Sequence, residues 1–131
     1  INPDVIIWTF KEYPDARINP YIYAYLDINN GFVTKISEKT PISATPNKDN
    51  IVQGVFYFKN KKILYKAINS MIKRRNKVNG EYYIATAINE LIELKMKIVP
   101  FQVDQYISWG TPFDLKNYEF WSERFSKNNE S

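Results

Sequence analysis

The first strand-like segment of the chain constrains its fold more than any other feature. Residues 4–10 (DVIIWTF) form a nearly continuous apolar and β-branched run. Such a run is typical of a strand that is buried on both faces, as in a sheet that carries helices. The sequence therefore predicts an α/β fold, and we expect this strand to require neighbours from outside the chain.

The pattern that follows alternates between strand and helix signals. Residues 21–27 and 32–38 are predicted to form a hairpin around Asn29-Asn30-Gly31, and residues 51–58 return to strand character. Apolar residues at helical spacing predict helices over 61–73 and about 81–94. We expect their buried positions to be Ile63, Leu64, Ala67, Ile68, Met71, Ile72, Ile84, Ala87, Ile88, Leu91 and Ile92.

The C-terminal third is predicted to add short strands at 97–103 and 105–108 and one more helix. Thr111 is the predicted N-cap of this helix and Pro112 its first residue. Its apolar stripe consists of Leu115, Tyr118, Trp121 and Phe125. The complete pattern predicts a mixed sheet covered by helices, with a polar tail at residues 127–131.

The composition excludes several classes of chemistry. The chain has no Cys and no His, which removes disulfides, thiolate or imidazole zinc sites, Cys nucleophiles and His-dependent triads. No apolar run approaches the roughly 20 residues that cross a bilayer, and the start does not resemble a signal peptide. We therefore expect a cytoplasmic protein with no membrane partner.

Charge gives only weak guidance about partners. The 18 basic and 14 acidic residues give a net charge of +4, which suits a phosphate-bearing ligand or simply a lysine-rich surface. A nucleic-acid site could be built on Lys73-Arg74-Arg75-Asn76-Lys77 and the tyrosines. Basic residues at the end of a helix are also favoured by the helix dipole, so we expect no nucleic-acid partner.

Phosphate-binding loops are absent from the sequence, because its four glycines are isolated from one another. Three other places could carry a site. Glu38-Lys39 is either a solvated strand end or a carboxylate and ammonium for sugar hydroxyls and phosphate. Gly54 marks a bulge or the close approach of a ligand, and Trp109-Gly110 precedes a capped helix that needs no function.

The order of these segments resembles one enzyme family. A strand ending in Glu-Lys-x-Pro, a strand with an internal Gly, the segment Asn-Gly-Glu-Tyr-Tyr-Ile and the motif Trp-Gly-Thr-Pro-x-Asp-Leu follow one another here. The set is similar to the C-terminal half of the sugar-phosphate nucleotidyltransferases and runs over about residues 4–125. This resemblance implies the second half of a Rossmann-like (GT-A-like) fold, with residues 1–126 as the sugar-phosphate-binding part.

The resemblance also implies an activity and roles for individual residues. In this family a sugar 1-phosphate and a nucleoside triphosphate give a nucleotide-sugar and pyrophosphate, with Mg²⁺, for polysaccharide assembly such as capsule or lipopolysaccharide. Lys39 would bind the sugar phosphate. The residues implied at the sugar are Tyr23, Ala24, Glu38, Gly54, Trp109 and Gly110.

Two positions depart from the family pattern. Ala24 replaces a glycine and adds a methyl group beside the sugar, and Thr86 occupies the usual position of a metal-binding Asp, with Glu81 a weak substitute. The nucleotide-binding half has no counterpart here, so we expect the chain to be inactive alone. The alternative is a non-catalytic regulatory or assembly module of the same fold. Exposed Tyr and Trp side chains are compatible with self-association.

Overall fold

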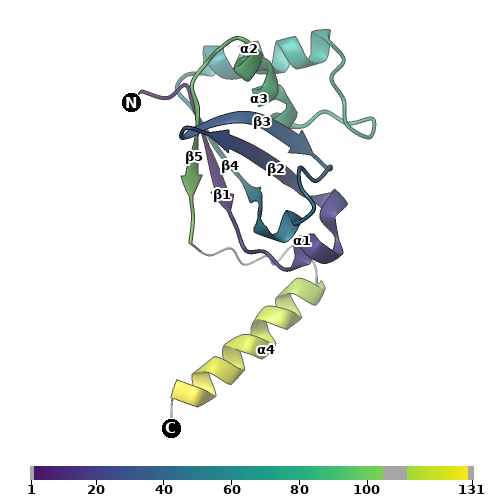
Figure 1. Cartoon of the computed structure of the whole chain (residues 1–131), viewed down its shortest axis with the longest axis vertical. Coiled ribbons are helices and arrows are strands. Elements are labelled where there is room, and N and C mark those ends of the chain that lie inside the picture. Colours follow the sequence, from purple (N-terminus) through teal and green to yellow (C-terminus); the bar gives the residue numbers. More distant parts are fainter. Residues whose placement is uncertain (1, 105–111, 130–131) are drawn as a thin grey trace.

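The computed structural model of the chain describes residues 2–104 and 112–129. Within these residues the fold is α/β, with a mixed five-stranded sheet in the order β3-β2-β4-β1-β5 (Figure 1). The strands are β1 (Val5–Phe10), β2 (Ala24–Asn29), β3 (Phe32–Glu38), β4 (Asn50–Phe58) and β5 (Ile98–Gln102). The helical elements are α1 (Asp15–Ile18), η1 (Pro20–Ile22), η2 (Pro46–Lys48), α2 (Lys61–Lys73), α3 (Ile84–Glu93) and α4 (Pro112–Asn129).

Strand β1 lies inside the sheet, between β4 and β5, and both of these neighbours come from this chain. It pairs antiparallel with β4 and parallel with β5, so the expectation that its neighbours lie elsewhere is wrong. Val5 and Ile7 are fully buried, as the apolar run predicts. The local pattern indicates burial but does not identify the pairing strands, because those are brought in by later segments of the chain.

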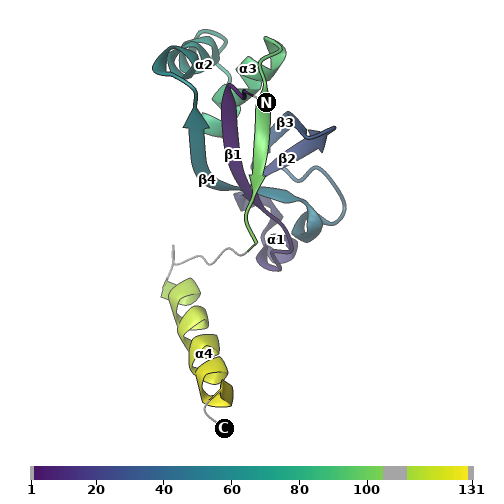
Figure 2. The ribbon, with the colours of Figure 1, turned by 90° about the vertical axis from the view of Figure 1, so that its left-hand side faces the viewer.

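The two faces of the sheet are covered differently. Helices α2 and α3 pack on one face, where Ala67 and Leu91 join Ile7 and Leu26 in the main core. Short α1 covers one end of the other face and buries the residues Phe10, Ala16, Tyr25 and Ile51. Elsewhere on that face Val55, Tyr57 and Phe101 remain exposed. Figure 2 shows α2 and α3 together at one end of the sheet and α1 at the other.

The hairpin turn and most helix positions follow the sequence prediction, but the first hairpin strand begins at Ala24 rather than at residue 21, because Pro20–Ile22 form η1. Asn30 and Gly31 both have positive φ angles, 53° and 82°, as a tight two-residue hairpin requires. Helix α2 has the predicted bounds, whereas α3 begins at Ile84 rather than 81. Residues 78–81 form a small bridge around a turn, which delays the helix. Two residues predicted to be buried, Ile72 and Ile84, are exposed. Ile72 lies on the side of α2 away from the buried Ile63, Ala67 and Met71, and Ile84 is the first residue of α3.

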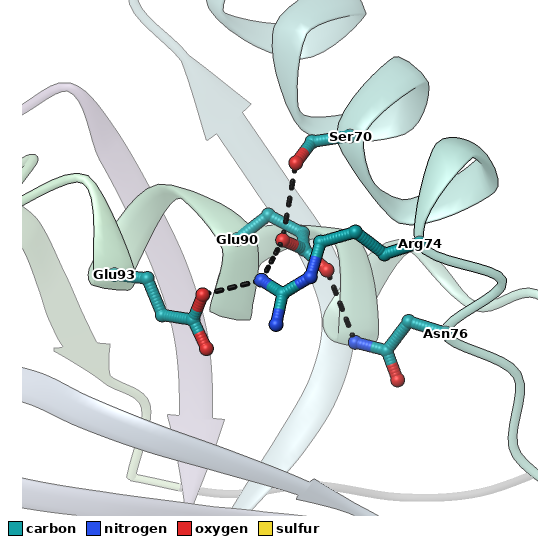
Figure 3. A network of polar contacts seen from close by, with 5 residues as sticks. All are labelled: Ser70, Arg74, Asn76, Glu90 and Glu93. Carbon is teal, nitrogen blue, oxygen red and sulfur yellow. Dashed lines mark hydrogen bonds and ion pairs between the residues drawn. The ribbon is translucent and has the colours of Figure 1, made fainter.

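A buried carboxylate joins α2 to α3 (Figure 3). Glu90 of α3 accepts hydrogen bonds from Ser70 Oγ at 3.1 Å and from Asn76 Nδ2 at 3.2 Å. It also forms an ion pair with Arg74 at 2.7 Å, and Arg74 in turn contacts Glu93. The Glu90 side chain is 2% exposed. Its charge is therefore paired and hydrogen-bonded at the helix interface rather than solvated.

Helix α4 begins the second described range, residues 112–129. It lies beyond the end of the sheet that is farther from α2 and α3 (Figures 1 and 2). It begins at Pro112 as predicted and continues to Asn129, into the predicted tail. Its apolar stripe is exposed, with Phe125 the most accessible member. Among the described residues, no helix is long and apolar enough to cross a membrane.

Candidate functional site

A cavity of about 240 Å³ lies where β2, β3 and β4 meet the first turn of α3. Its lining consists of Ile22, Tyr23, Ala24, Glu38, Val52, Gly54, Phe56, Tyr83, Ile84 and Ala85. Most of these side chains are apolar, and Glu38 contributes the one carboxylate. A mainly apolar cavity with a few polar groups is the usual form of a small-molecule site.

Glu38 lines this cavity and Lys39 lies beside it, because β3 ends next to the start of β2. Glu38 is paired with Ala24 in the sheet, and the backbone N–H of Lys39 donates to the carbonyl of Tyr23 at 2.9 Å. Lys39 has a left-handed backbone, with φ at 63°. This conformation is uncommon for lysine, and such strain tends to occur at functional positions.

Glu38 and Lys39 place charges of opposite sign next to each other beside the cavity. Burial raises the pKa of Glu38, and the neighbouring Lys39 partly offsets this effect. The Lys39 ammonium donates to the carbonyl of Ile22 at 3.2 Å and lies 5.5 Å from the ring centroid of Tyr83. An ammonium has three donors, so Lys39 can bind an anion without leaving this position.

Gly54 lies in an irregularity of β4 that opens the cavity. The β1–β4 register pairs Ile7 with Phe56 and Thr9 with Val52, so three residues of β4 stand opposite Trp8 alone. Gly54 has a φ of 110°, and a Cβ at this position would meet no atom within 4 Å. Glycine therefore provides both the backbone conformation and the free space at the wall.

Two tyrosines are held in place around the cavity. Tyr23 donates to the Asp15 carboxylate, and burial together with this hydrogen bond raises its pKa. Tyr83 donates to Glu81 at 2.7 Å, which raises its pKa. Both hydroxyls therefore stay protonated at neutral pH, and the Tyr83 ring is fixed beneath the Lys39 ammonium.

The structure brings most of the predicted sugar-site residues together. Tyr23, Ala24, Glu38 and Gly54 line the cavity, and Lys39 lies beside it. Trp109 and Gly110 lie outside the described residues. The binding roles of all these residues remain predictions, because their proximity defines a place for a ligand but not its identity.

The position expected to hold metal offers little to Mg²⁺. Thr86 is buried in the first turn of α3, and its Oγ1 has no hydrogen-bond partner among the described residues. Glu81 already accepts from Tyr83. No group of three acidic side chains in the described ranges could hold an ion. Since Mg²⁺ prefers carboxylates and phosphate oxygens, these residues do not form a magnesium site by themselves.

Sequence reasoning missed part of the cavity and its support. Val52 and Phe56 flank Gly54 at strand spacing, which could have indicated them, but Tyr83 and Ala85 come from the start of α3, which is distant in the sequence. Asn89 of α3 was also missed: its side chain accepts from the Ile36 N–H at 2.9 Å and donates to the Ile36 carbonyl at 2.7 Å. Asn89 thus makes the two hydrogen bonds that the backbone of a neighbouring strand would make. It fixes α3 to the edge strand β3 at Ile36, two residues before Glu38.

Replacing Glu38 with Gln is expected to stabilise the fold at neutral pH and weaken ligand binding. Because burial raises the folded-state pKa, the wild type loses stability as pH rises from the ordinary glutamate range through the raised value. The variant avoids this loss, so its advantage in urea unfolding should appear at pH 7 and vanish near pH 4. Losing the charged acceptor should weaken binding of a polyhydroxyl ligand by about tenfold.

The exposed Glu12 provides the control for this comparison. Glu12→Gln should change the unfolding free energy little at either pH. If Glu38→Gln were less stable than the wild type at pH 7 and equally so at pH 4, burial of the charge would not be what sets the Glu38 pKa.

The described fold is similar to solved structures of nucleotidyltransferases. A nucleoside-diphosphate-sugar pyrophosphorylase from Vibrio cholerae RC9 has 21% sequence identity and a TM-score of 0.72 over 88% of this chain. An inositol-1-phosphate CTP transferase from T. maritima has 17% identity and a TM-score of 0.61 over 93%. A CMP:2-keto-3-deoxy-manno-octonic acid synthetase, solved with CTP, has 12% identity and a TM-score of 0.54 over 93%.

These similarities show the fold that the resemblance predicts. The chain spans about half of each matched structure, 46%, 46% and 50% respectively. No known family profile matches the sequence. No curated protein matches it either.

Proposed function

We propose that the cavity binds a sugar 1-phosphate as the acceptor site of a cytoplasmic nucleotidyltransferase. The observation that carries this proposal is the meeting of Glu38, Lys39, Ala24 and Gly54 at one cavity, in a fold shared with nucleotidyltransferases. Carboxylate oxygens suit sugar hydroxyls, and an ammonium suits a phosphate. Residues 1–126 form this sugar-phosphate-binding part, and the product would serve polysaccharide synthesis of the capsule or lipopolysaccharide kind.

In the proposed reaction, an oxygen of the sugar phosphate attacks the α-phosphorus of a nucleoside triphosphate. The bond to the β-phosphate oxygen breaks, and pyrophosphate leaves with its charge. Lys39 would offset the charge of the sugar phosphate and orient it, while Glu38 and the apolar walls hold the sugar. Mg²⁺ would arrive with the triphosphate and be held mainly by phosphate oxygens, so no described residue is assigned to it.

The nucleotide itself is proposed to bind to a part of the fold without a counterpart in these 131 residues. Support comes from the matched structures, which are about twice as long. The exposed Val55, Tyr57 and Phe101 on one sheet face are also compatible with a further packed layer. The chain alone is therefore proposed to bind the acceptor without completing the reaction.

Replacing Lys39 with Ala tests the proposal directly. Isothermal titration would compare a panel of hexose 1-phosphates with the free sugars and with inorganic phosphate. We expect the sugar phosphates to bind best and Lys39→Ala to weaken them by about tenfold to a hundredfold, because it removes a charge-assisted contact. Lys35→Ala, which alters an exposed lysine of β3, should leave binding unchanged.

Two outcomes would contradict the proposal. Failure of every sugar phosphate to bind better than its free sugar would remove the acceptor role. Equal binding by the wild type and Lys39→Ala would remove Lys39 from the site. If binding is confirmed but no pyrophosphate is released once a nucleotide-binding part, a triphosphate and Mg²⁺ are supplied, the fold acts as a non-catalytic binding module.

A further inference from the structure

Helix α2 and the residues beside it concentrate positive charge on one surface. Residues 59–77 contain no Asp or Glu. They contain eight basic residues, all exposed: Lys59, Lys61, Lys62, Lys66, Lys73, Arg74, Arg75 and Lys77. This segment therefore holds eight of the 18 basic residues of the chain and none of its 14 acidic residues.

The geometry of α2 shows which of these basic residues lie on the side of the helix away from the core. Ile63, Ala67 and Met71 are buried against the main core. At 3.6 residues per turn, the opposite side of α2 carries Lys61, Lys62, Lys66 and Lys73 together with Tyr65 and Ile72. We call these six residues the lysine face. Tyr65 is 57% exposed and Ile72 49% exposed, so one aromatic and one aliphatic side chain project among four ammonium groups.

Acidic side chains near α2 do not neutralise this face. Glu90 and Glu93 of α3 are both engaged by Arg74, at the inner edge of the helix (Figure 3). Arg74 is therefore committed to the helix interface, while the lysines carry no ion pair in the described structure. None of the cavity residues belongs to α2, so this surface is independent of the proposed acceptor site.

We propose that the lysine face docks the protein on an anionic lipid surface. Lysines with long apolar stems, a tyrosine and an isoleucine are the residues that adsorb at a lipid interface, where charge attracts and the apolar groups insert shallowly. Nucleic-acid surfaces rely more on the planar fork of arginine. Of the two arginines next to the lysine face, Arg74 is engaged by Glu90 and Glu93, and Arg75 lies beyond the end of α2. The absence of a membrane-spanning run does not bear on this, since adsorption requires no span.

Vesicle co-sedimentation tests the proposal with the chain as it stands. The wild type should bind phosphatidylcholine vesicles that contain about a third of phosphatidylglycerol, and should not bind phosphatidylcholine alone. Binding should weaken with salt as the charges are screened. The triple variant Lys62→Glu, Lys66→Glu, Lys73→Glu should lose more than roughly a hundredfold in partitioning. Removing each lysine costs about fivefold, and the added repulsion increases the loss.

A matched triple variant separates the lysine face from net charge. Lys11→Glu, Lys35→Glu, Lys48→Glu alters exposed lysines elsewhere and changes the net charge equally, so binding should fall by only a few-fold. A similar loss in both triples would overturn the proposal. So would absent binding by the wild type, or tighter binding to mixed oligonucleotides than to the vesicles. Circular dichroism would check that each variant is folded. If the Glu variant of the lysine face unfolds, a variant with the same three lysines changed to Gln replaces it in the test.

Discussion

Gly54→Val is expected to abolish measurable sugar-phosphate binding and to destabilise the fold by about 2 kcal/mol. The φ of 110° at Gly54 is one that β-branched residues strongly disfavour, at a cost on the order of 1–3 kcal/mol. The added side chain would also occupy open space at a wall of a cavity of only about 240 Å³. Titration with the best sugar phosphate and urea unfolding measure the two effects separately.

Gly31 supplies the control for backbone strain. It has a φ of 82°, no neighbour within 4 Å of an added Cβ, and a position in the hairpin turn away from the cavity. Gly31→Val should therefore destabilise the fold to a similar extent and leave binding unchanged. If both variants bind equally well, Gly54 supports the strand but does not shape the ligand site.

Local signals were enough to predict most of the fold. The apolar spacing of α2 and the Asn30-Gly31 turn each act within a few residues, and both were located correctly. Helix α1 was missed because four residues between two prolines carry no periodicity. The partners of β1 were misjudged because pairing with β4 and β5 depends on how distant segments return to the sheet.

The residues of the candidate site also fall into those with a local sequence signal and those that only the tertiary fold brings to the site. Glu38, Lys39 and Gly54 were identified because each breaks a strand pattern locally, by charge or by the absence of a side chain. Tyr83 lies more than forty residues beyond Lys39 in the sequence, and only the tertiary fold places its ring near the ammonium. Glu90 was not anticipated, because a carboxylate within a helical pattern normally indicates a solvated position.

Glu90→Ala is expected to lower the unfolding free energy by about 3 kcal/mol. The substitution leaves a space between α2 and α3 and removes the acceptor shared by Ser70, Arg74 and Asn76. Breaking a buried, hydrogen-bonded charge typically costs about 3–5 kcal/mol, and the remaining exposure of Arg74 to solvent moderates that figure. Urea unfolding monitored by circular dichroism gives the free energy.

Glu93→Ala is the matched control, because Glu93 lies on the same helix and contacts the same Arg74. Its side chain is 63% exposed, compared with 2% for Glu90. An exposed ion pair contributes roughly 0–1 kcal/mol, so Glu93→Ala should cost far less than Glu90→Ala. Equal losses would mean that Arg74 pairing alone, rather than burial of a satisfied carboxylate, joins the helices. A large loss confined to Glu90→Ala would show that this polar contact fixes α2 against α3.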